Sequence, residues 1–440
     1  MTHATASARA LLPLLLFLCI FLGSGVYYSA IGTEFAFYQL KAPVAALAAI
    51  ILAVLLHQST INQAIDTLLD GIGQRNIILM ALVFLLAGAF ASVSKDIGSV
   101  DATVQLGLHW IPASFVLPAL FVIAGFIATA MGTSMGTIAA TAPIATGFAV
   151  ATGLNPALAL GAVVGGAMFG DNLSMISDTT IAATRSQGVS LRDKFRVNIW
   201  IALPAALITL LVLALLGGDA HNTVKQSASL WLVLPYVLVF ALALSGLHVL
   251  AVLTIGVGLS GLLGLLLTAD YTVPQFGTGI YSGFESMFEI TLLAMLIGGL
   301  SALMQQQGGT HWLIQQIQSL TTHLHIARHK AGELGVVLLV SIANFFVANN
   351  TVAIVLTGDI ARDIAEQHGV DPRRTASLLD IFSCVVQGLI PYGAQILLAS
   401  SIAQLSPLEL VGSVYYCWVL ALVAVFALIW NLPRLKYVQV

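Results

Sequence analysis

Charged residues are the main thing this sequence lacks. Of its 440 residues, 16 are Lys or Arg and 19 are Asp or Glu, so only 8% are charged, whereas a soluble globular domain carries about a quarter. The formal net charge is -3 and no stripe of basic residues occurs. Such a chain has no surface that could neutralise nucleic-acid phosphates, so we expect no nucleic acid among its partners.

Cysteines and enzyme motifs are also scarce. Cys19, Cys384 and Cys417 lie separately in apolar runs, which indicates neither a disulfide framework nor a metal cluster. Neither GxxxxGK[ST] nor HExxH occurs, so a Walker-type ATP site and a zinc protease site are not indicated. GDNLSMISD supplies no convincing pair of nucleophile and base. The sequence therefore predicts no enzyme and no resident cofactor.

Long apolar runs are abundant, and hydrophobic residues make up 59% of the chain. Several runs, such as 76–93 and 249–268, approach the roughly 20 residues that cross a bilayer as a helix. Others are short and interrupted by Gly, Pro or polar residues. Such interrupted runs are typical of half-helices and re-entrant hairpins. We expect an all-α polytopic membrane protein surrounded by lipid, with 11–30 retained as its first helix.

An internal repeat emerges from one alignment register. GLNPALAL at 153–160 matches GVDPRRTA at 369–376, and the same register places MGTSMGT at 131–137 over VANNTVA at 347–353. It also places NLSMISDTT over GLIPYGAQI. LAGAFASV also resembles LIGGLSAL. The distance between these two segments is six residues shorter than in the first match, and an insertion in a loop would account for the difference. Because the polar interruptions coincide, the sequence predicts two related halves.

Polar clusters inside apolar runs have a physical meaning in lipid. Backbone that leaves a helix at membrane depth is tolerated only where protein or a water-filled cavity surrounds it. Secondary transporters place such broken helices around the bound substrate and ions. On this basis we expect substrate or ion contacts from four clusters: Thr133 and Ser134; Asp171, Asn172, Ser174, Asp178 and Thr179; Asn349, Asn350 and Thr351; and Gln387, Tyr392 and Gln395.

Asp171 and Asp178 carry the sharpest chemical prediction. An ionised carboxylate in the bilayer interior is costly, so it needs a cation or a proton. A proton and a sodium ion compete for one buried carboxylate, which is the minimum chemistry of cation/proton exchange. Asp171 and Asp178 are therefore the Na+ candidates, with Na+ as coupling ion and H+ as counter-ion. One alternative is that Asp171 caps a helix, and another is that both acids lie at a cytoplasmic interface near Arg185.

Two further expectations concern charged residues outside these clusters. Asp380 either completes an ion site or pairs with Arg373 or Arg374. By the positive-inside rule, the basic residues of 184–196 and of the C-terminal tail face the cytoplasm. These residues are Arg185, Arg192, Lys194, Arg196, Arg434 and Lys436.

The segment from GTSMGT through GAVVGGAMFGDNLSMISDTT to the basic residues after it resembles the signature region of the NhaC-type Na+/H+ antiporter family. ANNTVAIVLTGDIARDI and LLDIFSCVVQGLIPYGAQ resemble a subgroup of that family. The family includes relatives that carry amino acids or carboxylates. The likeness extends from about residue 76 onward.

This resemblance implies an inner-membrane secondary transporter built from two inverted structural repeats with re-entrant hairpins. It also implies a transport domain that moves against a scaffold domain, and a homodimer. By this comparison, Thr133 to Ser134 and Asn349 to Thr351 lie at hairpin tips, and Asp171, Asn172, Ser174 and Asp178 couple the cation. The expected parts are N-terminal segments (1–75), a first repeat (76–198), linking helices (199–285), a second repeat (286–410) and a last helix with the tail (411–440).

The cargo stays open at this stage. Na+/H+ antiport is the leading function. The alternative is sodium- or proton-coupled transport of a small amino acid or carboxylate, because Asn350, Gln387, Tyr392 and Gln395 offer more neutral polar groups than a bare sodium site requires. A channel is a third class, but two halves with dissimilar polar breaks favour alternating access. Where the first half has Asp178 the second has Ala394, which indicates that one half is specialised.

Overall fold

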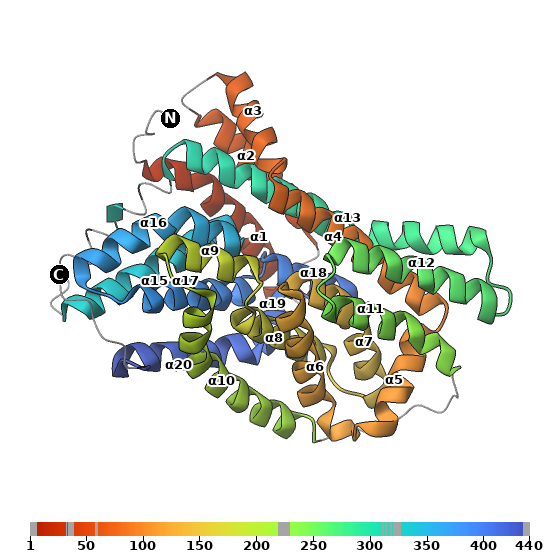
Figure 1. Cartoon of the computed structure of the whole chain (residues 1–440). Coiled ribbons are helices and arrows are strands. Elements are labelled where there is room, and N and C mark those ends of the chain that lie inside the picture. Colours follow the sequence, from red (N-terminus) through yellow and green to blue (C-terminus); the bar gives the residue numbers. More distant parts are fainter. Residues whose placement is uncertain are drawn as a thin grey trace.

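The computed structural model describes residues 7–31, 33, 39–57, 60–218, 229–309, 312, 315–316, 319 and 327–433. Across these ranges the regular structure is helical, without a strand (Figure 1). Within them, 10 helices are long and apolar enough to cross a membrane, or up to 11 if the bent pair Pro407–Ser413 and Tyr415–Trp430 is one span. The prediction of an all-α polytopic membrane protein is confirmed.

The described residues form the following α-helices in chain order. Their bounds are α1 (Leu12–Ala30), α2 (Ala42–Leu55), α3 (Ile61–Ile72), α4 (Arg75–Asp96), α5 (Ser99–Trp110), α6 (Val116–Met131), α7 (Ser134–Thr152), α8 (Pro156–Leu173), α9 (Asp178–Gln187), α10 (Leu191–Leu216), α11 (Leu234–Leu244), α12 (Val249–Leu267), α13 (Val273–Gln306), α15 (Arg328–Val347), α16 (Asn350–His368), α17 (Pro372–Leu389), α18 (Ala394–Ala403), α19 (Pro407–Ser413) and α20 (Tyr415–Trp430). Helices α10 and α13 run without interruption across the expected part boundaries at 198 and 285.

Corresponding helices of the two halves have equal lengths. Helices α7 and α16 each have 19 residues, α8 and α17 each have 18, and α9 and α18 each have 10. The second helix of each pair begins 216 residues after the first, at 134 and 350, 156 and 372, and 178 and 394. This is the register that the GLNPALAL and GVDPRRTA match predicts.

Both expected helix breaks are present, and each spans four residues. The PYGAQ segment ends α17 at Leu389, and α18 starts at Ala394, because Pro391 cannot donate a backbone hydrogen bond to continue the helix. In the first half, α8 ends at Leu173 and α9 starts at Asp178. The prediction of broken helices is confirmed.

Small residues allow α8 to lie very close to α6. A Cβ atom on Gly166 would lie 2.2 Å from the Phe121 carbonyl oxygen, and one on Gly170 would lie 2.3 Å from the Gly125 carbonyl oxygen. Van der Waals contact between closely approaching backbones is the main source of helix association in lipid. The glycines before Asp171 therefore let the C-terminal part of α8 pack directly against α6.

Candidate ion-binding site

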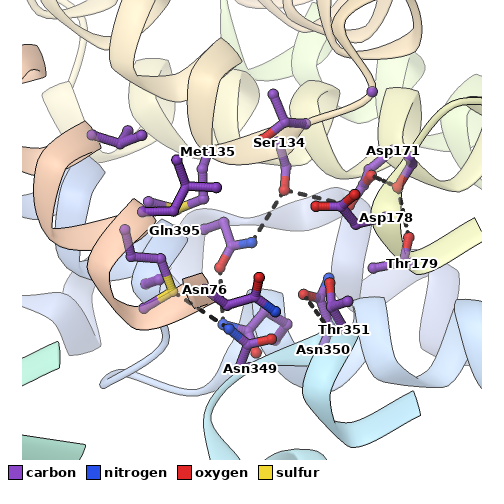
Figure 2. Close-up of a pocket in the computed structure, with 18 of the residues that line it drawn as sticks. Asn76, Ser134, Met135, Asp171, Asp178, Thr179, Asn349, Asn350, Thr351 and Gln395 are labelled. Atoms are coloured by element: carbon purple, nitrogen blue, oxygen red, sulfur yellow. Dashed lines mark hydrogen bonds between the residues drawn. The ribbon is translucent and has the colours of Figure 1, made fainter. Parts of the chain in front are cut away.

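A cavity of about 90 Å³ lies where the two helix breaks meet the α6/α7 and α15/α16 turns. Figure 2 shows polar side chains from both halves pointing toward one another around it. Its lining includes ten of the residues predicted from sequence: Thr133, Ser134, Asp171, Asp178, Thr179, Asn349, Asn350, Thr351, Gln387 and Gln395. Clusters up to 262 residues apart in the sequence, from Thr133 to Gln395, are thus brought into one site.

The two turns that face the cavity have the same backbone form. Gly132 ends α6 in the left-handed conformation, with φ 68°, and the Thr133 hydroxyl accepts a bond from the Gly136 N–H. In the second half Ala348 ends α15 with φ 54°, and the Asn349 side chain accepts from the Val352 N–H. Each turn therefore starts a helix at the cavity, and in each a side chain accepts a hydrogen bond from one N–H group of the first helical turn.

Asp171 is the buried acid of the site, with 4% of its surface exposed. Its carboxylate accepts hydrogen bonds from the hydroxyls of Ser177 at 2.5 Å and Ser134 at 3.4 Å. The Ser177 and Thr179 hydroxyl oxygens lie 2.8 Å apart. These oxygens gather at the C-terminal end of α8, where the helix dipole favours a cation.

A chain of amides continues this network into the second half. Gln395 donates its Nε2–H to the Ser134 hydroxyl at 3.1 Å, and Gln387 donates to Gln395 Oε1 at 2.9 Å and to the Ala348 carbonyl at 3.1 Å. Hydrogen bonds therefore connect Asp171 to the second turn. The Oε1 atom of Gln387 is buried and accepts no bond from the residues that the structure describes.

Asp178 is exposed, whereas Asp171 is buried, although both line the cavity. Asp178 lies in the first turn of α9 and lines both the cavity and an adjoining hollow of about 850 Å³, here called the entrance hollow. Arg185 and Arg362 line only the entrance hollow. Asp171 accepts bonds from hydroxyls and faces the cavity, so its carboxylate does more than cap a helix.

A second hollow, of about 940 Å³, lies at the other ends of α4, α7 and α18 and is called the opposite hollow. Helices α7 and α18 start at the cavity and lead to the opposite hollow, which they line with Gly147 and Ser401. Their counterparts α16 and α9 also start at the cavity but line the entrance hollow, with Asp359 and Arg185. Matching helices of the two halves thus lead from the cavity to different hollows.

Three predicted site residues lie outside the cavity lining. Asn172 is buried and donates its side-chain N–H to the Tyr416 hydroxyl at 3.1 Å. The Ser174 hydroxyl accepts from the Ile176 N–H inside the break. Tyr392 donates to the Phe345 carbonyl at 2.6 Å. These contacts stabilise the two breaks.

The structure also corrects the expected partners of Asp380. Asp380 forms an ion pair with Lys194 at 2.7 Å, so the pairing with Arg373 or Arg374 is wrong. Arg373 pairs with Asp371 at 2.7 Å, and Arg374 pairs with Glu333 at 3.1 Å.

Asp371, which precedes α17, lies outside the candidate membrane spans. Burial by itself would raise the pKa of Asp371, but hydrogen bonds from Arg373 hold that pKa below its ordinary value. This carboxylate therefore belongs to a local pair at the start of α17.

Sequence reasoning missed three residues of this region. Asn76, at the start of α4, lines both the cavity and the entrance hollow. Lys194 and Asn198 are fully buried in α10, so Lys194 is not part of an exposed basic segment. Their spacing of four residues places them on one helix face, which is the signal that could have linked them. Arg434 and Lys436, also assigned to the cytoplasmic face, lie outside the described residues.

Known proteins are similar to this chain over most of its length. The family model described as "Na+/H+ antiporter family" matches residues 3–218 and 219–432. Two proteins named Na(+)/H(+) antiporter NhaC are similar. The one from Alkalihalophilus pseudofirmus is 25% identical over 367 residues, covering 76% of this chain and 77% of the relative. The one from Bacillus subtilis is 27% identical over 357 residues, covering 74% and 78%.

A relative with a different printed name is similar to the same extent. The malate-2H(+)/Na(+)-lactate antiporter of Bacillus subtilis is 25% identical over 341 residues, which are 71% of this chain and 72% of the relative. Proteins of this kind therefore carry names with both inorganic and organic cargoes.

Proposed function

Because the chain belongs to the Na+/H+ antiporter family, we propose that this integral membrane protein exchanges Na+ for H+ across the bacterial plasma membrane, and that Asp171 binds the two cations in turn. The protein then acts as a secondary transporter and not as an enzyme. Na+ is its coupling ion and H+ its counter-ion.

The observation that carries this proposal is the chemistry of the cavity lining. It contains the carboxylates of Asp171 and Asp178, hydroxyls and amides, and it contains no Lys, Arg or His among the described residues. A buried negative charge without a basic partner in the same cavity attracts a cation strongly, because the low dielectric screens little. Sodium is a hard cation that prefers oxygen ligands, and the oxygens of Asp171, Ser134, Ser177 and Thr179 converge there.

Competition between Na+ and H+ for Asp171 couples the movement of the two ions. One carboxylate holds either a sodium ion or a proton, because each neutralises the single charge that makes burial costly. Asp178, which lines both the entrance hollow and the cavity, attracts the cation from the hollow toward Asp171. Loss of Asp171 would then remove both ion sites at once.

Alternating access follows from the arrangement of the halves, which we propose to be inverted repeats. Helices α7 and α18 lead to the opposite hollow, and their counterparts α16 and α9 lead to the entrance hollow. Between the cavity and the opposite hollow, Ile138, Ala142 and Leu398 are fully buried. Release to that side requires these packed turns to part, as in movement of a transport domain against a scaffold domain.

The second candidate function is sodium- or proton-coupled transport of a small amino acid or carboxylate. The side chains of Gln387, Asn349 and Asn350 provide neutral polar groups in the cavity lining, in addition to Asp171. These groups favour an organic cargo with an ammonium or hydroxyl group. A bare carboxylate is disfavoured because the lining holds no cationic side chain.

The assembly state is a separate proposal. The family resemblance implies a homodimer, with membrane lipid around it. Mass measurement in lipid nanodiscs checks this proposal, and a mass of one chain per disc at all protein densities would reject it.

The exchange itself is tested in sealed proteoliposomes that contain a pH-sensitive dye and no organic solute. Pulses of Na+ should move protons in the opposite direction, K+ pulses should not, and Asp171→Asn protein that is folded and inserted should be silent. Silence from the wild-type protein would reject Na+/H+ exchange. Uptake that then appears only with an added amino acid or carboxylate would support the second candidate.

A further inference from the structure

A second buried charge cluster lies next to Asp171 but outside the cavity. The Lys194 ammonium and the Asp380 carboxylate are 2.7 Å apart, and each side chain is 1% exposed. Lys194 belongs to α10 and Asp380 to α17, so the pair joins the first half to the second. Neither residue lines the cavity.

The pair holds both sides of the α8/α9 break. Lys194 Nζ also donates to the Asn172 carbonyl at 2.9 Å, immediately after Asp171, and to the Thr180 hydroxyl at 2.6 Å. Asn198 donates its amide to the same Asn172 carbonyl at 2.9 Å and to Asp380 at 2.8 Å. The end of α8 leaves the Asn172 carbonyl without a hydrogen-bond partner in the helix. Lys194 and Asn198 both donate to this carbonyl instead.

The pair also sets the charge around the site. Asp171 interacts electrostatically with both Lys194 and Asp380. Lys194 cancels the charge of Asp380, so the three groups together carry one negative charge, that of Asp171. One monovalent cation is then enough to neutralise the buried cluster.

Resting on the proposed exchange function, we propose that Lys194 and Asp380 form a positioning pair for Asp171. The pair fixes the break so that the Asp171 carboxylate faces the cavity, and it leaves Asp171 with one uncompensated charge for Na+ or H+. Lys194 and Asp380 themselves do not contact the transported ion.

The test compares single and paired charge removal. In Asp380→Asn, Lys194 loses its acidic partner. The positive charge of Lys194 then neutralises Asp171 and repels Na+. The Lys194→Gln/Asp380→Asn double variant replaces the ion pair with two neutral amides, which keep hydrogen-bonding groups at the break, and it restores the single negative charge. A matched control is Glu333→Gln, which breaks the buried Glu333–Arg374 pair, in which both side chains are 3% exposed and neither lines the cavity.

Na+ binding is measured in detergent as the Na+-dependent rise of apparent melting temperature, at constant ionic strength with choline. Asp380→Asn should raise the half-saturating Na+ concentration about tenfold or more. The double variant should lie within about threefold of wild type, because paired removal leaves Asp171 as the single uncompensated buried charge, as in the wild-type protein. Glu333→Gln should lower stability and leave the half-saturating concentration unchanged.

Each outcome has a distinct meaning. Unchanged Na+ binding in folded Asp380→Asn, or binding by the double variant that is as weak as in Asp380→Asn, overturns the positioning pair. If Asp380→Asn does not fold, the double variant decides: weak binding by a folded double variant rejects the pair, and near-normal binding supports it. If wild-type protein neither binds Na+ nor exchanges it in proteoliposomes, the proposed function itself fails, and the role of the pair fails with it.

Discussion

Gln395 donates a hydrogen bond to the Ser134 hydroxyl across 3.1 Å, although 261 residues separate them. Ser134 starts α7 in the first half, and Gln395 lies in the first turn of α18 in the second. Because Ser134 also donates to Asp171, this contact links the amides of the cavity lining to the carboxylate. It connects the two halves inside the site (Figure 2).

Loss of this contact should weaken Na+ binding without loss of fold. Ser134→Ala and Gln395→Ala should each raise the half-saturating Na+ concentration about three- to tenfold, because a net hydrogen bond contributes about 1 kcal/mol. The effects should not add in the double variant, because both substitutions remove the same bond. Exchange assays on the four proteins measure this coupling, and strictly additive effects would show that the contact does not influence the ion.

The two turns at the cavity should respond oppositely to substitution. Gly132→Ala places a Cβ 2.8 Å from Ile176 Cγ1 at a left-handed φ of 68°. It should lower the apparent melting temperature, since the left-handed conformation alone costs an L residue about 1–2 kcal/mol. Ala348→Gly removes that cost at φ 54° and should raise the melting temperature slightly, because the extra unfolded-state entropy of Gly cancels part of the gain.

Differential scanning fluorimetry of the purified variants in the same detergent measures both changes of apparent melting temperature. A stabilising Gly132→Ala, or a strongly destabilising Ala348→Gly, would contradict the left-handed geometry of the turn concerned.

Asn350 should influence ligand affinity more than stability. It begins α16 at the cavity and is 7% exposed. Asn350→Ala should raise the half-saturating concentration of Na+, or of an organic cargo, about fivefold or more, because an amide that contacts the ligand is lost. Thr357→Ala, in the same helix but outside the cavity lining, is the matched control and should leave affinity unchanged. Equal effects of the two substitutions would make Asn350 structural.

The two hollows should open to opposite sides of the membrane. In a Cys19→Ser background, which removes the exposed cysteine, Asp359→Cys labels the entrance hollow and Ser401→Cys the opposite hollow. A membrane-impermeant thiol reagent should modify the first from the cytoplasmic side, where the positive-inside rule places the basic segments, and the second from the other side. Modification of both from one side would reject this account of the two hollows.

Local chemistry alone determined much of this protein. The length and hydrophobicity of the runs predicted membrane-spanning helices, because lipid requires backbone groups to bond within the helix. Pro391, Gly393 and the polar residues around Asp171 predicted where helices break. The register between 153–160 and 369–376 predicted the equal helix lengths of the halves. Each of these signals is contained within a short stretch of sequence.

Only the tertiary structure decided which polar groups meet. Asp380 has Arg373 and Arg374 nearby in sequence, yet its partner is Lys194, 186 residues away, because α10 and α17 pack together. Tyr392 lies in a polar helix break, as the site residues do, but it donates to the Phe345 carbonyl and does not line the cavity. Asn76 has the sequence context of an ordinary helix start, yet it lines the cavity. The sequence specifies which groups need a partner in lipid, whereas the partner depends on which helix faces pack together, and that choice is made by contacts spread over the whole chain.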